Sequence, residues 1–234
     1  MFRLISLIAV AGTAALCALH YATFGTRRWR PGESGPSVYR FSVWERLIHA
    51  FGLLAFLTLA GTGFWTVVVR RDPLDGWLWM VHAVAGWVFG IAMVLMTLLW
   101  AVDCRFASHD WTWTKRFGGY LGGGGKLPAG RFNAGQKVFF WCSVVLGLGT
   151  LASGLALMLP VFDPPFQESI CQVHRYGSLL FVISVIVHLY VATLANPGTV
   201  RSMVVGTVDA EWAEHHHPLW LDDTGGTHDG GSRE

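Results

Sequence analysis

The sequence predicts an all-α integral membrane protein: a four-helix transmembrane bundle and one extra N-terminal transmembrane helix. Hydrophobic residues make up 53% of the 234 residues and charged residues only 14%, with a mean hydropathy of +0.44. Soluble domains carry about a quarter charged residues, so this chain belongs in lipid. Five stretches are apolar over the ~20 residues that a transmembrane helix needs. Four histidines lie inside the last four of these stretches or at their edges.

The first apolar stretch, residues 4–24, allows two interpretations. A cleaved signal peptide would have Arg3 as the one charged residue of its n-region. Its removal would leave the arginine-rich segment that follows outside the membrane, against the positive-inside rule. An uncleaved anchor over residues 1–25, with a periplasmic N-terminus, agrees better with these arginines. We therefore predict the anchor and keep cleavage as the alternative.

Four further stretches, at 47–69, 77–102, 138–162 and 171–195, form the predicted bundle inside a membrane domain that covers residues 26–220. The segments between them are polar, and none is long enough for a separate soluble domain. A large catalytic module must therefore come from another chain. Residues 221–234 are rich in Gly, Asp, Thr and Ser and are predicted to form a disordered polar tail. No basic aromatic stripe indicates binding to nucleic acid.

Basic residues predict the orientation of the bundle. Segment 25–46 carries five arginines, segment 103–137 carries six lysines and arginines, and the turn at 163–165 carries none. By the positive-inside rule the two basic segments and the C-terminal tail are cytoplasmic. Arg70 and Arg71, on a short outer loop, go against this pattern but are outnumbered.

The four histidines are spaced as two pairs at two depths. An imidazole in hydrocarbon costs several kcal/mol unless a partner satisfies it. His174 and His188 are fourteen residues apart, which is ~21 Å along one face of a helix. His49 lies at the cytoplasmic end of its stretch and His82 at the outer end. Depth therefore pairs His49 with His188 on the cytoplasmic side and His82 with His174 on the outer side. Each pair can supply two axial nitrogens to one low-spin haem iron.

Small and basic residues close to the histidines agree with this prediction. Three glycines lie on the helix face of a predicted ligand, three or four residues after it: Gly52, Gly86 and Gly177. A missing side chain there would let a flat macrocycle approach the backbone; the alternative is ordinary helix packing through small residues. Arg46, one turn before His49, and Arg175, beside His174, are candidates to neutralise haem propionates.

The other histidines and the cysteines carry weaker signals. His20, alone in the first stretch, is predicted to be a packing residue with satisfied polar atoms, and His109 a solvent-exposed loop residue. The run at 215–217 could hold a metal, but adjacent residues seldom converge on one ion without other ligands. The four cysteines contain no CxxC pair, so we expect neither a zinc site nor a disulfide framework.

A polar motif, RFNAGQK at 131–137, leads into the fourth stretch after a glycine-rich loop that we expect to be a flexible surface connection. Hydrogen-bonding groups there meet the membrane at the level of the cytoplasmic histidine pair. A quinone site needs this combination of an apolar cleft, polar donors for the carbonyls and a nearby haem. The alternative is an ordinary interfacial helix start.

Four segments resemble the cytochrome b (gamma) subunit of respiratory formate dehydrogenases. They are WERLIH at 44–49, RFNAGQK at 131–137, residues 174–190, and WAEHHHPLW at 212–220. The resemblance runs from about residue 41 to residue 220, and the second and fourth segments are its most specific parts. The histidine spacing alone is shared with a wider group that includes the cytochrome b subunits of nickel–iron hydrogenases. The extra N-terminal stretch, the glycine-rich loop and the longer acidic tail depart from the best-known members.

The resemblance implies a cytochrome b with two b haems that anchors a formate dehydrogenase, as a multi-pass protein, in the bacterial inner membrane. It also implies a menaquinone or ubiquinone site at Asn133 and Gly135, with the ligand His188 at its border. Two partners on the outer face are implied: an iron–sulfur subunit and a catalytic subunit that contains molybdenum or tungsten. Electrons from formate would enter the outer haem, cross to the cytoplasmic haem and reduce quinone. The chain itself would not oxidise formate.

Two other functions stay open at this point. A cytochrome b subunit of a nickel–iron hydrogenase or of another membrane-bound oxidoreductase would hold the same haems and take electrons from another donor. A haem-free anchor or transporter would use the histidines to relay protons or to bond helices. Against this second alternative, we expect the spans to contain no buried carboxylate, a group that proton relays commonly use.

Overall fold

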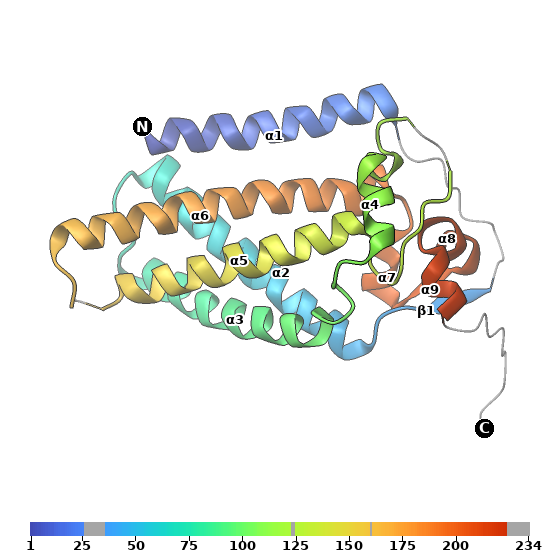
Figure 1. Cartoon of the computed structure of the whole chain (residues 1–234). Coiled ribbons are helices and arrows are strands. Elements are labelled where there is room, and N and C mark those ends of the chain that lie inside the picture. The colour runs from blue at the N-terminus through green and yellow to red at the C-terminus, as the bar shows by residue number, and fades with distance from the viewer. Residues whose placement is uncertain (26–35, 123–124, 160, 224–234) are drawn as a thin grey trace. The chain divides into compact units, whose positions relative to one another are not determined.

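The structure is a computed structural model that describes residues 1–25, 36–122, 125–159 and 161–223 (Figure 1). The chain divides into two compact units. The first contains Met1–Ala18, Trp44–Ala101 and Phe139–Leu189, and the second contains Leu19–Val43, Val102–Val138 and Tyr190–Glu234.

Five helices in the described part of the chain are long and apolar enough to cross a membrane, which confirms the predicted fold class. They are α1 (Phe2–Phe24), α2 (Val43–Phe64) with its π-helical continuation η1 (Trp65–Arg70), α3 (Gly76–Trp100), α5 (Ala134–Leu157), and α6 (Pro164–Tyr190) with its π-helical continuation η3 (Val191–Ala195).

Three of these helices, α2, α5 and α6, begin four or more residues earlier than their apolar stretches predict. Helix α6 begins seven residues before residue 171, with Pro164 in its first turn. Proline suits that position because the first helical N–H groups have no partner inside the helix. The carbonyl of Asp163 accepts the N–H groups of Phe166 and Gln167 at 3.1 and 3.0 Å. Helix α5 begins at Ala134, four residues before residue 138.

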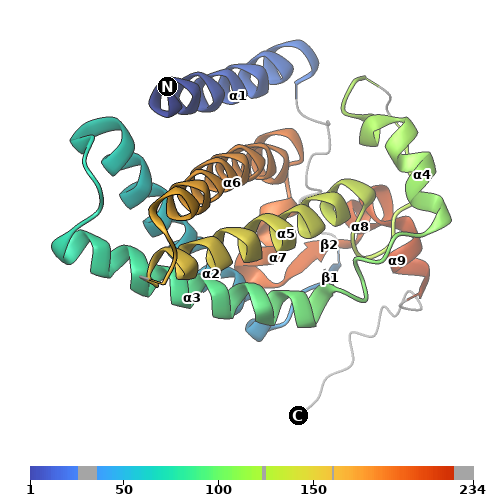
Figure 2. The same cartoon turned by 60° about the vertical axis from the view of Figure 1, so that its left-hand side comes forward.

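The first unit is a bundle of α2, α3, α5 and α6, which lie side by side in both views (Figures 1 and 2). Its centre is an aromatic cluster of Phe56 on α2, Phe89 on α3 and Phe181 on α6, with ring centroids 5.2 to 6.3 Å apart. Helix α5 meets this cluster at Gly147, where a Cβ would lie 3.4 Å from both Phe89 and Phe181. Helix α1 is largely exposed along its length, and Phe2 packs edge-on against Tyr176.

The second unit folds segments that the sequence predicts to be connections. Its elements are β1 (Ser37–Tyr39), α4 (Ser108–Lys115), η2 (Phe117–Gly119), α7 (Thr199–Val205), β2 (Thr207–Asp209), α8 (Ala210–His216) and α9 (Pro218–Asp223). Strands β1 and β2 pair antiparallel, with Val38 opposite Val208. Helix α9 extends three residues into the predicted tail; the rest of that tail, with His228, lies outside the described residues.

Arg40 and Arg131 link the segments of the second unit. Arg40 donates to the carbonyl of Arg131 at 2.9 Å and to His217 Nε2 at 3.1 Å, while Arg131 donates to the carbonyl of Arg40 at 2.9 Å. The Arg40 guanidinium lies 5.1 Å from the ring of Trp212 and 5.7 Å from that of Trp220. Burial, together with the charge of Arg131, lowers the pKa of Arg40 to about 9, so Arg40 stays charged at neutral pH. The WAEHHHPLW segment thus contributes to packing.

Candidate functional site

The structure brings the predicted outer histidine pair together. The ring centroids of His82 on α3 and His174 on α6 are 6.3 Å apart, with ring planes at 67°. Two metal–imidazole bonds of ~2 Å, plus about 1 Å from each bonding nitrogen to its ring centre, would put two axial rings roughly 6 Å apart. The observed separation is therefore compatible with both imidazoles holding one iron.

Hydrogen bonds indicate which ring nitrogen carries the proton in both histidines of this pair. His82 Nδ1 lies 2.7 Å from Thr62 Oγ1, and that hydroxyl donates its own proton to the carbonyl of Thr58 at 2.7 Å. With the Thr62 proton on this carbonyl, which can only accept, His82 donates Nδ1–H to Thr62. His174 Nδ1 lies 3.0 Å from the carbonyl of Thr150, which can only accept. In both rings the proton is on Nδ1 and Nε2 keeps its lone pair, as a metal-binding histidine requires.

Glycines near the histidines have different roles. A Cβ on Gly154 of α5 would lie 3.2 Å from His174 Cε1, so this glycine gives the ring its space. A Cβ on Gly52 would lie 3.0 Å from Met96 Cε, and one on Gly177 3.1 Å from Thr150 Cγ2. These two glycines therefore let neighbouring helices approach, in agreement with the packing alternative. A Cβ on Gly86 would meet no atom within 4 Å.

The second predicted pair, His49 on α2 and His188 on α6, also lies within the first unit. His188 stacks on Phe139, with centroids 4.0 Å apart and planes at 4°. His49 lies 6.3 Å from the Trp100 ring. Within the described residues neither imidazole makes a hydrogen bond, in contrast to the outer pair.

A buried carboxylate, which the sequence did not lead us to expect, accompanies this pair. Glu45, one turn before His49 on α2, is 8% exposed and accepts a hydrogen bond from Trp100 Nε1 at 2.7 Å. The prediction that the spans contain no such group is wrong, because α2 begins at Val43 and includes Glu45. A haem-free function is therefore opposed by the geometry of the histidine pairs and not by the composition of the spans.

An aromatic layer separates the two histidine pairs along the helices. Phe56 and Phe89 each follow a histidine by seven residues, and Phe181 lies seven residues from both His174 and His188. Seven residues correspond to about 10 Å of helix. We did not single out these residues from the sequence, although the seven-residue interval to each histidine was a usable signal.

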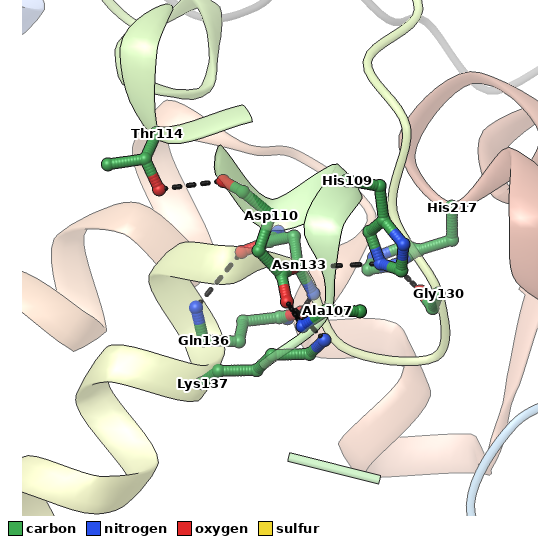
Figure 3. Close-up of polar contacts among 9 residues, drawn as sticks. All are labelled: Ala107, His109, Asp110, Thr114, Gly130, Asn133, Gln136, Lys137 and His217. Atoms are coloured by element: carbon green, nitrogen blue, oxygen red, sulfur yellow. Dashed lines mark hydrogen bonds and ion pairs between the residues drawn. The ribbon is translucent and has the colours of Figure 1, made fainter. Parts of the chain in front are cut away.

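The motif that leads into α5 has a defined geometry (Figure 3). Asn133 Oδ1 accepts the N–H of Gln136 at 2.9 Å, and Gln136 Oε1 accepts the N–H of Asn133 at 3.0 Å, which is a capping box. The amide Nδ2 of Asn133 has no partner among the residues that the structure describes. A Cβ on Gly135 would lie 2.7 Å from Trp113 Cη2. Asn133 therefore retains free donors, and Gly135 makes room for an indole.

Two predicted residues, Arg46 and Arg175, are placed without a test of their roles, while a third, His20, has defined partners. Arg46 is half-buried on α2 and Arg175 is exposed on α6, so their contacts with haem propionates stay predictions. His20 accepts a hydrogen bond from the Tyr190 hydroxyl at 2.5 Å and donates to the carbonyl of Tyr120 at 3.0 Å. The prediction that His20 is a satisfied packing residue is confirmed.

Comparison with known proteins places the chain among membrane cytochromes b. A family model described as prokaryotic cytochrome b561 matches residues 40–206. The formate dehydrogenase cytochrome b556(fdo) subunit of Escherichia coli K12 is 26% identical over 196 residues, which cover 79% of this chain and 92% of that subunit. The cytochrome b556(Fdn) subunit of the nitrate-inducible formate dehydrogenase of the same strain is 28% identical over 144 residues, 56% of this chain and 65% of the relative. A formate dehydrogenase cytochrome b556 subunit of Haemophilus influenzae is 26% identical over 146 residues, 60% and 61% of the two chains.

Proposed function

The chain belongs to the prokaryotic cytochrome b561 family, and from this premise we propose that it is the dihaem cytochrome b subunit of a membrane-bound formate dehydrogenase. The names of its relatives support formate dehydrogenase as the enzyme to which this subunit belongs. The observation that carries the proposal is the 6.3 Å separation of His82 and His174 with both Nε2 lone pairs free. A haem with two histidine ligands supplies one-electron transfer without an open coordination position.

The chain's own part is to hold and orient the two haems. His82 and His174 would hold the outer haem, with Thr62 and the carbonyl of Thr150 setting the ring orientations. His49 and His188 would hold the cytoplasmic haem. Two haems per chain, in place of one, are supported by the presence of two histidine pairs in the first unit, which share helix α6.

We further propose that the chain passes electrons to menaquinone or ubiquinone at Asn133 and Gly135, next to the ligand His188. The free amide donors of Asn133 support this, because a quinone carbonyl needs a donor. Packing against Trp113 gives Gly135 a second reason to be glycine. The resemblance to formate dehydrogenase subunits connects these residues with His188, which belongs to the other unit.

The proposed partners are an iron–sulfur subunit and a molybdenum- or tungsten-containing catalytic subunit on the periplasmic face. The arginine distribution supports a periplasmic N-terminus and a cytoplasmic C-terminus. Arg70, one of the two contrary arginines, is paired with Asp75 of its own loop at 2.7 Å. The hydrogen bonds of His20 with Tyr120 and Tyr190 support the retention of α1 as a membrane anchor.

The proposed function is tested by a reduced-minus-oxidised spectrum of the purified chain, with haem quantified against protein, and by spectra of native membranes treated with formate or hydrogen. We expect two b haems per chain and reduction by formate. Reduction by hydrogen alone would support the hydrogenase alternative. If the chain folds in the presence of haem but binds none, the cytochrome function is overturned.

We predict that Thr62→Val raises the midpoint potential of the outer haem. Donation of Nδ1–H to Thr62 makes His82 a more basic ligand and so favours Fe(III); valine keeps the shape and cannot accept. One hydrogen bond is worth about 1 kcal/mol, and tenfold is ~59 mV for one electron, so we expect up to a few tens of mV in a redox titration. Thr150→Val is the control, since His174 uses the Thr150 backbone carbonyl. Equal shifts in both variants would contradict this reasoning.

We predict that Asn133→Asp raises the KM for quinone roughly tenfold, the loss expected for one unmade hydrogen bond, and leaves both haems in place. Aspartate caps a helix as well as asparagine does, so the first turn of α5 should keep its stability. Asn133→Ala removes both the cap and the donor, and we expect it to lose stability as well. Steady-state assays with a short-chain quinone, and thermal unfolding, separate the two effects. A normal KM in Asn133→Asp would remove Asn133 from the quinone site.

A further inference from the structure

A buried ion pair lies beside the first turn of α5 (Figure 3). Lys137 Nζ lies 2.7 Å from Asp110 Oδ2, and the two side chains are only 4% and 5% exposed. The same carboxylate oxygen accepts the N–H of Ala107 at 2.8 Å. Oδ2 therefore carries two hydrogen bonds, while Oδ1 is buried and accepts none.

The unused oxygen of Asp110 faces His109. His109 Nε2 lies 3.7 Å from Asp110 Oδ1, is itself buried, and makes no hydrogen bond. The separation is just beyond hydrogen-bond length, so a small rotation of the imidazole would close it. The rest of the His109 side chain reaches solvent, at 27% exposure. His109 is therefore not the fully solvent-exposed loop residue that the sequence predicts.

The exposure of the three side chains falls in order from His109 at 27% to Asp110 at 5% and Lys137 at 4%. Neighbouring charged groups have partners of their own, since Arg131 forms an ion pair with Asp103 at 2.7 Å. Burial, with a smaller contribution from Asp103, raises the pKa of the Cys104 thiol to about 12. This thiol therefore stays protonated at neutral pH.

Lys137 is also next to the proposed quinone site. It follows Asn133 by four residues, and its N–H donates to the carbonyl of Asn133 at 3.0 Å. Side chains four residues apart share a helix face. Lys137, the least exposed of the three titratable residues, thus lies on the same side of the helix start as the free amide donors of Asn133.

We propose that His109, Asp110 and Lys137 form a proton relay that delivers protons from solvent to a quinone bound at Asn133. The proposal rests on the proposed function, which supplies the two electrons. As a quinone carbonyl is reduced, a Lys137 Nζ–H bond breaks and an O–H bond forms on the quinone oxygen. His109, protonated by water, then gives this proton to Asp110 Oδ1. Rotation of the carboxyl group brings the new O–H to the lysine amine, which takes the proton and restores the ion pair. Two such cycles and two electrons convert quinone into quinol.

A purely structural ion pair is the competing explanation. Desolvating two charges costs several kcal/mol per ion, and apolar side chains of similar volume often replace a buried pair without loss of stability. A relay and a structural pair therefore predict different rates of quinone reduction for the double variant Lys137→Met with Asp110→Leu. In the structural case the double variant keeps the quinone rate; in the relay it is folded, haem-loaded and slow.

The test uses the full complex with its haems reduced by formate and then mixed with decyl-ubiquinone or a short-chain menaquinone, so that haem oxidation is followed optically. We expect Lys137→Met and the double variant to slow haem oxidation on the order of 10²-fold while reduction by formate stays normal. His109→Ala keeps the ion pair; we expect a smaller loss, restored by added imidazole because His109 reaches solvent. His20→Ala with imidazole is the control and should not respond.

Each result decides between the proposals. If quinone does not oxidise the haems of the unaltered complex, the proposed function fails. If it does, and Lys137→Met or the double variant reacts at the normal rate, the relay alone is overturned. A slow His109→Ala variant that imidazole does not restore would also overturn the relay, since a structural loss cannot be repaired by a free base. A haem spectrum identical to that of the unaltered complex shows that each variant is folded.

Discussion

We expect His82→Ala and His174→Ala to lose one and the same haem, and His49→Ala and His188→Ala to lose the other. An iron that keeps one axial histidine of two has an open position and no longer gives the low-spin spectrum of a haem with two histidine ligands. Each single substitution should thus halve the haem-to-protein ratio or convert half of the haem to a high-spin form. Redox titration then identifies which component is missing.

The pairing makes a stronger prediction than the ligand set alone, because four histidines can be paired in three ways. The 6.3 Å separation of His82 and His174 supports one of them. Low-temperature spectra of the four variants should fall into two matching sets. A shared loss in His49→Ala and His82→Ala would refute the pairing even if all four residues bind iron. His20→Ala, which changes a histidine with satisfied nitrogens, should keep both haems.

Substitution in the proposed cytoplasmic pair should also change the rate of quinone reduction. Under the proposed function, His188→Ala should abolish reduction of quinone, while formate should still reduce the outer haem. His82→Ala should instead block both processes at the entry point. Stopped-flow spectra with formate as the donor distinguish these patterns, and quinone reduction at the normal rate in His188→Ala would remove His188 from the electron route.

The features that were predictable from the sequence depend on position along one helix. Apolar length identified five spans. The fourteen-residue interval between His174 and His188 predicted two ligands on one helix face at two depths, and both residues lie on α6. These quantities need only the rise and the period of a helix. Apolar length alone did not predict the start of α2. Glu45 is charged, yet it lies inside this helix, where its carboxylate accepts a hydrogen bond from Trp100.

The features that were not predictable depend on how helices rotate against one another and on how connections fold. Thr62 reaches His82 across twenty residues of sequence, and no local pattern indicates that its hydroxyl faces the ring. Asp110 and Lys137 meet across 27 residues because the segment between α3 and α5 forms α4 and a small core. Their burial has no signature in composition, since both residues look like ordinary cytoplasmic charges.

We expect Gly118→Ala and Gly135→Ala to destabilise the second unit, because both glycines pack against the Trp113 indole. A Cβ on Gly135 would lie 2.7 Å from Trp113 Cη2, and one on Gly118 would overlap the same ring more closely. Such overpacking typically costs about 1–3 kcal/mol. Gly118 also has φ of +61°, where an L side chain adds roughly 1–2 kcal/mol. Gly118→Ala should therefore be the more damaging change, as measured by thermal unfolding.

Gly149→Ala on the same helix α5 is the matched control, since its Cβ would meet no atom within 4 Å and alanine suits a helix better than glycine by roughly 0.5–1 kcal/mol. Trp113→Leu removes the outer ring atoms and should rescue Gly135→Ala, so that the double variant is more stable than the two single losses predict.

This double-mutant cycle also separates the two explanations of Gly135. If the glycine serves packing, the rescue restores stability and the KM for quinone stays normal. If it serves the quinone, Gly135→Ala raises the KM at unchanged stability, and a smaller residue at position 113 restores nothing.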